Sequence, residues 1–434
     1  MSWKDEVATF LKTHGEPDRV EVMLCDLNAV LRGKWVPGTA LDKIGRGTVK
    51  LPVSTYAPNI FGEEVPESGL GIVQGDPDGA LLPVPGTLAP IPGGGAQVLV
   101  EMAGEWASPR GRLADIVTRF ADRGLTPCVA LELEFHLLQP RTAPEDPPVP
   151  PEGAPQAQNY DMEVLDRTAP VLDAILEGAA AQGLTTETVI AEYGPGQFEV
   201  NFRHCADALH AADMAVLFRR LVRTVATSHD LEATFMAKPY ADSPGNGLHA
   251  HVSLLNADGD NILATENGLS DPLGHAIAGS LATMADCQAI FAPHLNSYRR
   301  FQPMSFAPTA PDWGLDDRGA GVRVPTTSGR DARLEHRIAG ADANPYLALA
   351  AILGGILWGL DQRLTPPAPR GETETPPLGD DWSAAIDRFA TSDVTAWIFG
   401  DAYRDLYTAI RRNEIARLMP IIHPLEYATY LSRL

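Results

Sequence analysis

The sequence predicts an α+β protein of two domains. Between residues 20 and 100, short runs typical of β-strands alternate with Gly- and Pro-rich turns. Farther along, helical patterns alternate with short strands in which polar and apolar residues alternate. A chain of 434 residues with 44% hydrophobic and 21% charged residues is long enough for two cores. We therefore expect an N-terminal domain over residues 1–104 and a C-terminal domain over residues 105–434.

The expected elements follow in chain order. MSWKDEVATFLKTHG predicts an amphipathic helix and lacks the apolar run of a secretion signal. VEVMLCDL and AQVLVEMA predict strands, with turns such as PVPGTLAPIPGGG between them. Helices are expected over residues 111–123, 168–182, 206–228, 272–290, 344–362 and 381–417. The segment 140–156, PRTAPEDPPVPPEGAPQ, contains too much proline for either element and predicts an exposed loop.

Charge and cysteine content exclude several classes of protein. The formal net charge of −22 argues against nucleic acid or an anionic membrane as the main partner, because both are bound through clustered Lys and Arg. The longest apolar run, residues 346–360, is too short to span a bilayer. The cysteines lie far apart, so neither a disulfide framework nor a structural zinc site is predicted. A reducing compartment fits best, and we expect a cytoplasmic protein.

Four predicted strands carry chemically similar side chains on one face. ALELEFHLL alternates polar and apolar residues, which by itself is typical of any half-buried strand. GQFEVNF, GLHAHVSLL and ARLEHRIAG repeat the alternation, and lysine is missing from all four. Side chains sharing these faces would be Glu132, Glu134, His136, Gln197, Glu199, Asn201, His249, His251, Ser253, Arg333, Glu335 and Arg337. This restricted composition favours a functional surface over an ordinary solvated one.

Five carboxylates and at least one imidazole would meet in one cavity if the four strands share a sheet. The carboxylates are those of Glu132, Glu134, Glu192, Glu199 and Glu335. Like charges at that density repel one another, and divalent cations remove the conflict. Carboxylate oxygens with little nitrogen and no thiolate suit Mg²⁺ or Mn²⁺. Because one octahedral ion that also holds water and substrate cannot use six ligands, we expect two ions.

Arginines are concentrated near the end of the same region. They are Arg299, Arg300, Arg318, Arg323, Arg330, Arg333 and Arg337. The guanidinium fork suits phosphate and carboxylate oxygens, although some of these side chains would serve in structural ion pairs. Metal ions together with arginines indicate phosphoryl transfer from a nucleotide. The chain has no GxxxxGK[ST] motif, so a bound nucleotide would lie on a sheet rather than at a P-loop.

Six ordered motifs resemble those of the glutamine synthetase superfamily. They are ELEF, EYGPGQFEVNF, GNGLHAHVSL, NSYRRF, VRVP and RLEHRIAGADANPYL, and the resemblance extends over essentially the whole chain. It implies an N-terminal β-grasp domain and a catalytic domain whose curved antiparallel sheet forms a funnel flanked by helices. It also implies a ring-shaped homo-oligomer, a dodecamer, with active sites between neighbouring subunits.

The resemblance further implies a role for each matching residue. Glu134, Glu192 and Glu199 would bind a first metal ion, which activates the γ-carboxylate of L-glutamate, and Glu132, His249 and Glu335 a second, which holds the ATP phosphates. His251, Ser253, Arg323 and Arg333 would surround ATP, and Arg318 would stabilise charge on the moving phosphoryl group. Gly245, Arg300 and Arg337 would hold glutamate. Asp26, in CDLNAVLRGK, would attract the protonated amine in a neighbouring subunit. His136 would only support the site or face solvent.

One position departs from the family in a way that bears on the substrate. The family's flap glutamate, six residues after the arginine matched by Arg300, is replaced by Phe306. Loss of a charge and gain of an apolar ring make room for an alkyl group on the amine, with a shifted loop as the alternative interpretation. A second departure is Pro244, where the family has Asn, and it affects the expected contacts to glutamate.

N-terminal motifs narrow the expected activity. LPVSTYAPNIFGEEV, GDPDG and PVPGTL resemble the γ-glutamylpolyamine synthetase branch. We expect an ATP-dependent ligase that joins the γ-carboxylate of L-glutamate to an organic amine, putrescine or a polyamine first, through γ-glutamyl phosphate. Glutamine synthesis from ammonia, or ligation of a monoamine such as ethanolamine or methylamine, are alternatives. A non-catalytic ring protein is disfavoured because every metal-ligand position is filled, and an amidohydrolase because its ligands are normally histidine-rich.

Overall fold

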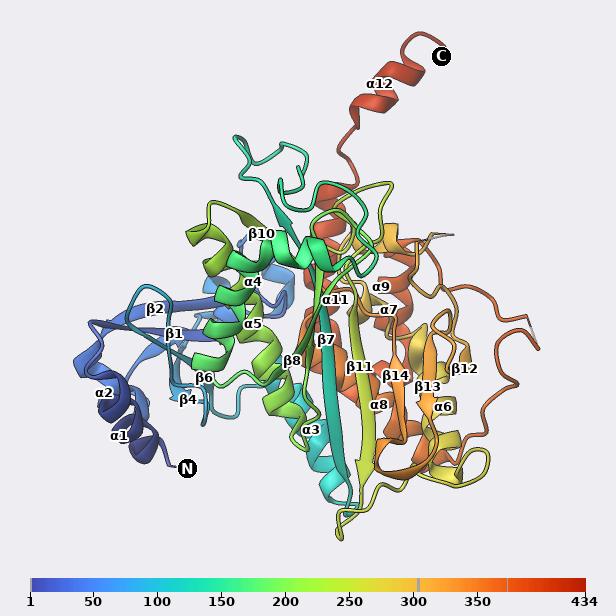
Figure 1. The fold of residues 1–434 in the computed structure, drawn as a ribbon, viewed down its shortest axis with the longest axis horizontal. Helices are drawn as coiled ribbons and strands as arrows, with labels where there is room; N and C mark the ends of the chain where they lie inside the picture. Colours follow the sequence, from blue (N-terminus) through green and yellow to red (C-terminus); the bar gives the residue numbers. More distant parts are fainter. Residues whose placement is uncertain (1, 303–304, 373) are drawn as a thin grey trace.

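Two β-sheets organise the chain in the computed structural model, which describes residues 2–302, 305–372 and 374–434 (Figure 1). The N-terminal strands form a mixed sheet, and the strands after residue 126 form a longer, mostly antiparallel one. Strand β6 (Ala96–Met102) belongs to the first sheet, and helix α3 (Pro109–Ala121) leads to the second. The expected domain boundary at residue 104 falls in the turn between them, and the division there stays a prediction.

The N-terminal sheet is built around strand β1 (Arg19–Cys25), which pairs antiparallel with β2 (Leu31–Pro37) and parallel with β6. Helix α1 (Trp3–His14) precedes it and starts with a capping box between Ser2 and Asp5. The other elements here are α2 (Leu41–Gly45), β3 (Lys50–Pro52), β4 (Asp78–Pro83) and β5 (Ala89–Pro90). The strand order is β2-β1-β6-β4-β3, with β5 beside β6. Assignment of this sheet to the β-grasp type stays a prediction.

The second sheet brings the four polar strands of the sequence next to one another. Its order is β12-β13-β14-β11-β7-β9-β8, with β10 also paired to β7. The bounds are β7 (Thr126–Leu138), β8 (Thr186–Ala191), β9 (Gln197–Phe202), β10 (Glu232–Thr234), β11 (Leu248–Leu255), β12 (Trp313–Leu315), β13 (Val322–Thr326) and β14 (Arg333–His336). The polar strands β14, β11, β7 and β9 are consecutive neighbours, so their polar faces form one continuous surface.

Helices supply most of the core behind this sheet. Helix α8 (Pro345–Gln362) is buried along almost its whole length, and Asn344 caps its start by accepting from Tyr346 N and Leu347 N. It packs closely on α6 (Asp271–Met284), and both lie behind the strands in Figure 1. The other long helices of this layer are α4 (Met162–Ala181) and α5 (Ala208–Ser228). In the part of the chain that the structure describes, no helix is long and apolar enough to cross a membrane.

Three predicted helices have different limits in the structure. The expected helix over 381–417 is three helices, α9 (Trp382–Thr391), α10 (Asp393–Phe399) and α11 (Asp401–Leu418). Ser392 starts α10 as its N-cap, and Gly400, at φ 79°, ends it. The expected helix over 272–290 ends at Met284 and is followed by the short α7 (Gln288–Phe291). The expected helix over 168–182 begins earlier, at Met162, because Asp161 caps it.

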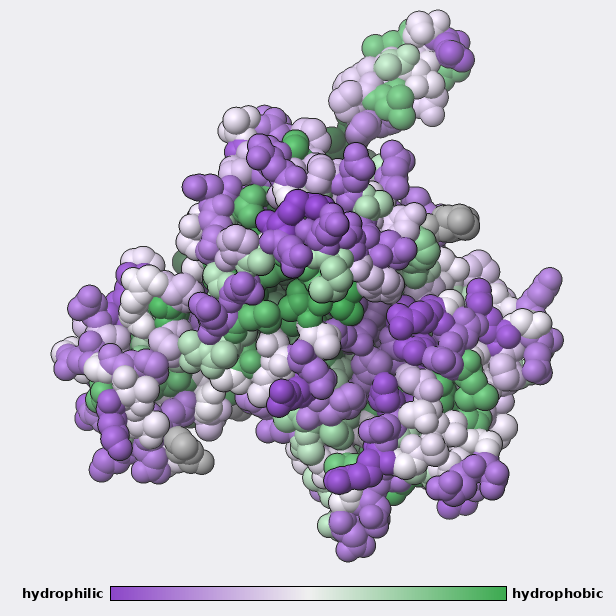
Figure 2. Space-filling model, viewed as in Figure 1, coloured by the Kyte–Doolittle hydropathy of each residue, from purple (hydrophilic) through white to green (hydrophobic). Residues whose placement is uncertain are grey.

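The chain ends in a short helix that extends away from the body of the protein. Helix α12 (Pro424–Tyr430) follows α11 and lies at the top of Figure 1, apart from both sheets. Figure 2 shows hydrophobic as well as hydrophilic residues on this projection. Its exposed apolar residues are Ile421, Ile422, Leu425, Tyr427, Tyr430, Leu431 and Leu434. This C-terminal arm, residues 420–434, therefore carries apolar surface that no other described part of the chain covers.

Candidate active site

A cavity of about 750 Å³ lies on the polar face of the second sheet. Its lining includes most of the residues that the sequence predicted for the site: Glu132, Glu134, Glu192, Glu199, Gly245, His249, Arg300, Phe306, Arg318, Arg323, Glu335 and Arg337. Hydrophilic residues gather in Figure 2 over the part of the molecule where β11, β14 and β13 lie. Residues separated by about two hundred positions in the chain thus share one cavity.

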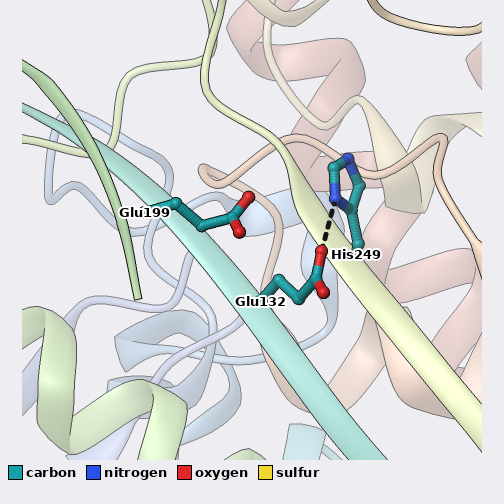
Figure 3. Close-up of side chains that lie close together, drawn as sticks. All are labelled: Glu132, Glu199 and His249. Carbon is teal, nitrogen blue, oxygen red and sulfur yellow. Dashed lines mark hydrogen bonds and ion pairs between the residues drawn. The ribbon is translucent and has the colours of Figure 1, made fainter. Parts of the chain in front are cut away.

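Strand register explains how the carboxylates and imidazoles meet. Glu132 on β7 is directly opposite His249 on β11 and Asn201 on β9. Glu134, two residues along β7, is opposite Glu199. His249 Nδ1 lies 3.0 Å from one oxygen of Glu132, and His251 Nε2 lies 2.9 Å from the other. Figure 3 shows the first of these contacts, with the carboxylate of Glu199 nearby. The alternation along β7 and the register of its neighbours therefore build the group.

Two groups of side chains have the spacing that a metal ion requires. The first consists of Glu132, Glu199 and His249, and the second of Glu132, His251 and Glu335. Within each group, one ligand atom per residue lies within 4.8 Å of the others. Carboxylate oxygens with one imidazole nitrogen are a suitable donor set for Mg²⁺ or Mn²⁺. The residues present therefore fit divalent cations, and the shared member Glu132 places the two groups side by side.

The electrostatics of the cavity favour positive charge. Burial, followed by the charges of Glu132 and Glu134, raises the pKa of Glu199 well above its usual value. Burial and the nearby Glu134 raise the pKa of Glu192 to about 7. Burial would also raise the pKa of Glu132, but hydrogen bonds from His249 and His251 outweigh it and lower that pKa. Carboxylates that hold protons because of one another release them when a cation binds.

Glu134 differs from Glu132 in its partners. One oxygen of Glu134 accepts from Gly247 N at 2.9 Å and from Gln197 Nε2 at 3.0 Å. Its other oxygen lies 4.0 Å from His249 Nε2. Glu134 belongs to neither three-residue group, whereas Glu199 lies with Glu132 and His249. The division of ligands between two ions that the resemblance implied stays a prediction.

Arginines line the same cavity as the carboxylates, and two of them pair with Glu335. Arg323 donates to Glu335 at 2.9 Å and also pairs with Asp316, and Arg337 pairs with the other oxygen of Glu335. Burial alone would raise the pKa of the buried Glu335, but the charges of Arg337, His249 and His251 outweigh it and lower that pKa. Arg300 is buried and donates to Ile338 O at 3.0 Å. The backbone at Gly245 lies against Arg300, so closely that a Cβ there would be 2.8 Å from Arg300 Cγ.

The remaining predicted nucleotide residues lie beside the cavity instead of lining it. His251 contacts Glu132, and Arg333 Nε lies 3.1 Å from His251 Nδ1. Ser253 is buried and donates to Ala332 O at 2.9 Å. Arg333 and Ser253 therefore hold the strands around His251, and their predicted contact with ATP stays a prediction.

Asp26 lies outside the cavity of its own chain. It is fully buried in the turn between β1 and β2, where Asn28 N and Val30 N donate to one oxygen and Arg32 Nε donates to the other at 2.9 Å. Asn344 Nδ2 also donates to the backbone oxygen of Asp26 at 2.8 Å. Burial raises the pKa of Asp26 to about 6, against the lowering effect of Arg32. These contacts give Asp26 a structural role, and its role in a neighbouring subunit stays a prediction.

Some residues at the site were not assigned a role by the sequence. Gln197 holds Glu134, and its amide nitrogen also lies 3.0 Å from Gly245 O. Tyr193 lines the cavity, with its ring centroid 5.1 Å from that of Phe306. Arg370 also lines it and pairs with Asp312 and Asp317. The alternation in GQFEVNF did place Gln197 beside Glu199, whereas Arg370 follows a proline-rich stretch that carries no comparable signal.

His136 lies in the core beside the loop that holds Asn246, and the expectation that it binds no metal stays a prediction. It is fully buried, and its Nδ1 lies 2.8 Å from Asn246 Oδ1. Burial lowers the pKa of His136 to about 3, so the imidazole is neutral. Asn246 in turn donates to Met236 O, next to the loop that holds Gly245 and Gly247. His136 therefore fixes the loop that orients Glu134.

Fold and site together define a protein with a cavity lined by arginines and by carboxylates that could hold divalent cations, and comparison with known proteins gives the family. Residues 106–430 match the protein family described as "Glutamine synthetase, catalytic domain". The chain belongs to the glutamine synthetase family. It is 37% identical over 98% of its length to gamma-glutamylputrescine synthetase PuuA of Escherichia coli (strain K12), 94% of which is covered.

Other relatives share the fold and differ in their named substrates. Gamma-glutamylethanolamide synthetase GlnA4 of Streptomyces coelicolor (strain ATCC BAA-471 / A3(2) / M145) is 38% identical, over 67% of this chain and 65% of its own. A solved GmaS/ADP complex is 26% identical and covers 98% of this chain and 99% of its own, with a TM-score of 0.84. These likenesses extend the family's fold over the N-terminal sheet as well.

Proposed function

We propose that this protein is an ATP-dependent ligase that joins the γ-carboxylate of L-glutamate to an organic amine. The relatives named for putrescine and ethanolamine support a glutamate–amine ligase. The observation that carries the choice of an organic amine is Phe306, which lines the cavity beside Tyr193 instead of presenting a carboxylate there. An apolar wall makes favourable contacts with the carbon chain of an organic amine, whereas ammonia has no carbon chain to contact it.

The proposed chemistry uses ATP to activate a poor acyl donor. Phosphorylation of the γ-carboxylate gives γ-glutamyl phosphate, and attack by the neutral amine then releases phosphate and forms the amide. Arg300, Arg337 and the backbone at Gly245 hold glutamate. Arg318 stabilises charge on the transferred phosphoryl group, and Arg323, Arg333, His251 and Ser253 position ATP.

Two or more Mg²⁺ or Mn²⁺ ions are part of the proposal. Glu134, Glu192 and Glu199 would hold one, and Glu132, His249 and Glu335 another. The ions would neutralise charge on the phosphates and polarise the γ-carboxylate. Burial and the repulsion of neighbouring glutamates, which together raise the pKa of Glu199 and Glu192, support a cation here.

We also propose a ring-shaped cytoplasmic homo-oligomer, a dodecamer, with the N-terminal sheet as a β-grasp domain. In such a ring, Asp26 would attract the protonated amine bound by a neighbouring subunit. Because its carboxylate is bonded within its own chain, this role requires the turn between β1 and β2 to open on assembly.

The test is ADP release by the purified protein with L-glutamate, Mg²⁺ and a panel of amines. We expect putrescine or another organic amine to give the highest kcat/KM, with release strictly dependent on glutamate. If ammonia outperforms every organic amine, the protein is a glutamine synthetase instead. Turnover that needs no ATP would show that it is not a ligase.

A further inference from the structure

Three aromatic side chains line the cavity without belonging to the core. Tyr160, Tyr193 and Phe306 are 57%, 43% and 65% exposed in this chain. The rings of Tyr193 and Phe306 lie in contact, with centroids 5.1 Å apart and planes inclined by 47°. Exposed aromatic rings usually reach a partner, because burying them would release water from a large apolar area. We call these three residues the aromatic wall.

Backbone hydrogen bonds join the two segments that carry Tyr160 and Tyr193. Tyr160 N donates to Ala191 O at 2.9 Å, and Gln158 N donates to Tyr193 O at 3.3 Å. The side chain of Gln158 also donates to Glu192 O at 3.1 Å. The segment before helix α4 is thereby fixed along the segment that follows strand β8. These hydrogen bonds therefore hold Tyr160 and Tyr193 at the cavity.

Positive backbone angles mark the same positions. Tyr160 has a φ of 68° and Phe306 a φ of 60°, a conformation that side chains with a Cβ rarely adopt. Such conformations persist only where surrounding contacts hold them, and they cluster at binding sites. Both residues turn their rings to the cavity lining despite this backbone cost.

The aromatic wall is attached to the carboxylates of the site. Tyr193 directly follows Glu192, and the next residue, Gly194, donates to Gln197 Oε1 at 2.8 Å. A Cβ on Gly194 would lie 2.6 Å from that oxygen, so the turn is tightly packed. Gln197 in turn donates to Glu134. The position of Tyr193 relative to Glu134 and Glu192 is therefore set by a short, rigid connection.

We propose that Tyr193, together with Phe306 and Tyr160, binds the carbon chain of the amine. Tyr193 is thereby a residue that determines which amine the enzyme uses. The inference rests on the proposed ligase function. The amines that the aromatic wall would bind are primary amines with an unbranched chain of at least two carbons. The chain packs on the aromatic faces while the amino group points to the carboxylates, and ammonia lacks the part that the wall binds. A second ammonium at the far end is compatible, because aromatic faces attract cations.

The experiment compares kcat/KM for ammonia, methylamine, ethylamine, propylamine, butylamine and putrescine, with ATP, L-glutamate and Mg²⁺. For the native protein we expect kcat/KM to rise with chain length. Tyr193→Ala and Phe306→Ala should each lower the butylamine to ammonia ratio at least ~10-fold and flatten the dependence on length, since each removes contacts to methylene groups. Tyr193→Phe should retain the native ratio, because it keeps the ring.

A matched control separates this effect from general damage. Met162→Ala removes an exposed apolar side chain two residues from Tyr160 that does not line the cavity, and it should leave the ratio unchanged. If alanine at position 193 abolishes turnover with every amine, Tyr193→Leu and Phe306→Leu decide the matter through the same ratio. An unchanged ratio in the variants of both residues would overturn the inference while leaving the ligase function intact. Absence of ADP release from the native protein with any amine would instead refute the ligase function.

Discussion

Glu132 and Glu134 lie on the same face of one strand and still have different surroundings. Glu132 is held between His249 and His251, which lower its pKa. Glu134 is held by Gln197 and by the backbone at Gly247. Two identical side chains two residues apart therefore have different hydrogen-bond partners, imidazoles around Glu132 and amides around Glu134.

Substitution of these two glutamates should separate the two halves of the reaction. Glu134→Ala should reduce use of L-glutamate, and Glu132→Ala should reduce use of ATP, each by at least about 10-fold in kcat/KM for that substrate. Steady-state ADP release with each substrate varied in turn measures both. Glu187→Ala, which removes an exposed glutamate on strand β8 of the same sheet, serves as control. Equal losses for both substrates in both variants would contradict the division.

A partly buried histidine away from the cavity, His294, should make the fold sensitive to acid. Burial, then the charges of Arg411 and Arg219, lowers the pKa of His294 well below its usual value of 6.5. His294 is therefore neutral in the folded protein and takes up a proton only on unfolding when the pH is below 6.5. Its contribution to stability is complete above pH 6.5 and is lost as the pH falls toward the folded pKa.

His294→Gln should therefore flatten the fall of the unfolding free energy with decreasing pH below pH 6.5. The expected difference in slope is at most about 1.4 kcal/mol per pH unit, the value for one proton. Urea unfolding between pH 5 and pH 7.5 measures it. His14→Gln, at the exposed end of helix α1, is the control. A steeper slope in the variant would show that the sign is wrong.

At the scale of elements, helices α6 and α8 cross with their backbones in contact. A Cβ on Gly279 would lie 2.2 Å from Gly355 O and 2.5 Å from Gly359 N. Because these are backbone atoms of a buried helix, they cannot move aside as a side chain does. Glycine is required at this crossing because it lets the two backbones approach this closely. It is not there to favour the helices themselves, since either helix alone would be more stable with alanine.

Gly279→Ala should lower the unfolding free energy by about 1–3 kcal/mol or more through overpacking. Gly274→Ala lies on the same helix, where the added Cβ would meet the side chain of Pro366 at ordinary contact distances, Cδ at 3.6 Å and Cγ at 3.9 Å. That control should change stability by less than about 1 kcal/mol, in the stabilising direction. Thermal unfolding of the two variants in parallel gives the comparison, and equal stabilities would contradict the role of the crossing.

Period-two alternation was sufficient to predict the strands of the site, because side chains on a strand point alternately to its two faces whatever its partners are. The helical pattern over residues 344–362 likewise predicted α8 (Pro345–Gln362). This kind of pattern failed for residues 381–417, where a continuous helical pattern conceals the breaks at Ser392 and Gly400. Those breaks depend on local capping, which hydrophobic periodicity does not record.

At the scale of the whole molecule, the C-terminal arm supports the proposed assembly. Leu425 and Leu431 are among its exposed apolar residues, and the arm stands apart from the body in Figure 1. Deletion of residues 420–434 should shift the native protein from a ring to smaller species, because apolar surface of this kind is stable only against another chain. Light scattering after size-exclusion chromatography gives the mass.

Point variants of the arm provide the comparison. Leu425→Asp and Leu431→Asp should weaken the assembly, whereas Ser432→Ala, on the same arm, should not. A full-length protein that is monomeric at micromolar concentration would contradict the proposed ring. An unchanged mass after deletion would show that other surfaces hold the ring together.

The sequence by itself determined which side chains share a strand face and in what order the motifs occur, because these follow from local backbone geometry. It therefore identified the carboxylates, the histidines and most of the arginines of the cavity. Tertiary structure decided that Glu199 lies with Glu132 and His249, that Asp26 is enclosed in its own chain, and that Tyr193 meets Phe306. Each of these depends on contacts between residues distant in the chain, which register and packing set and local pattern does not.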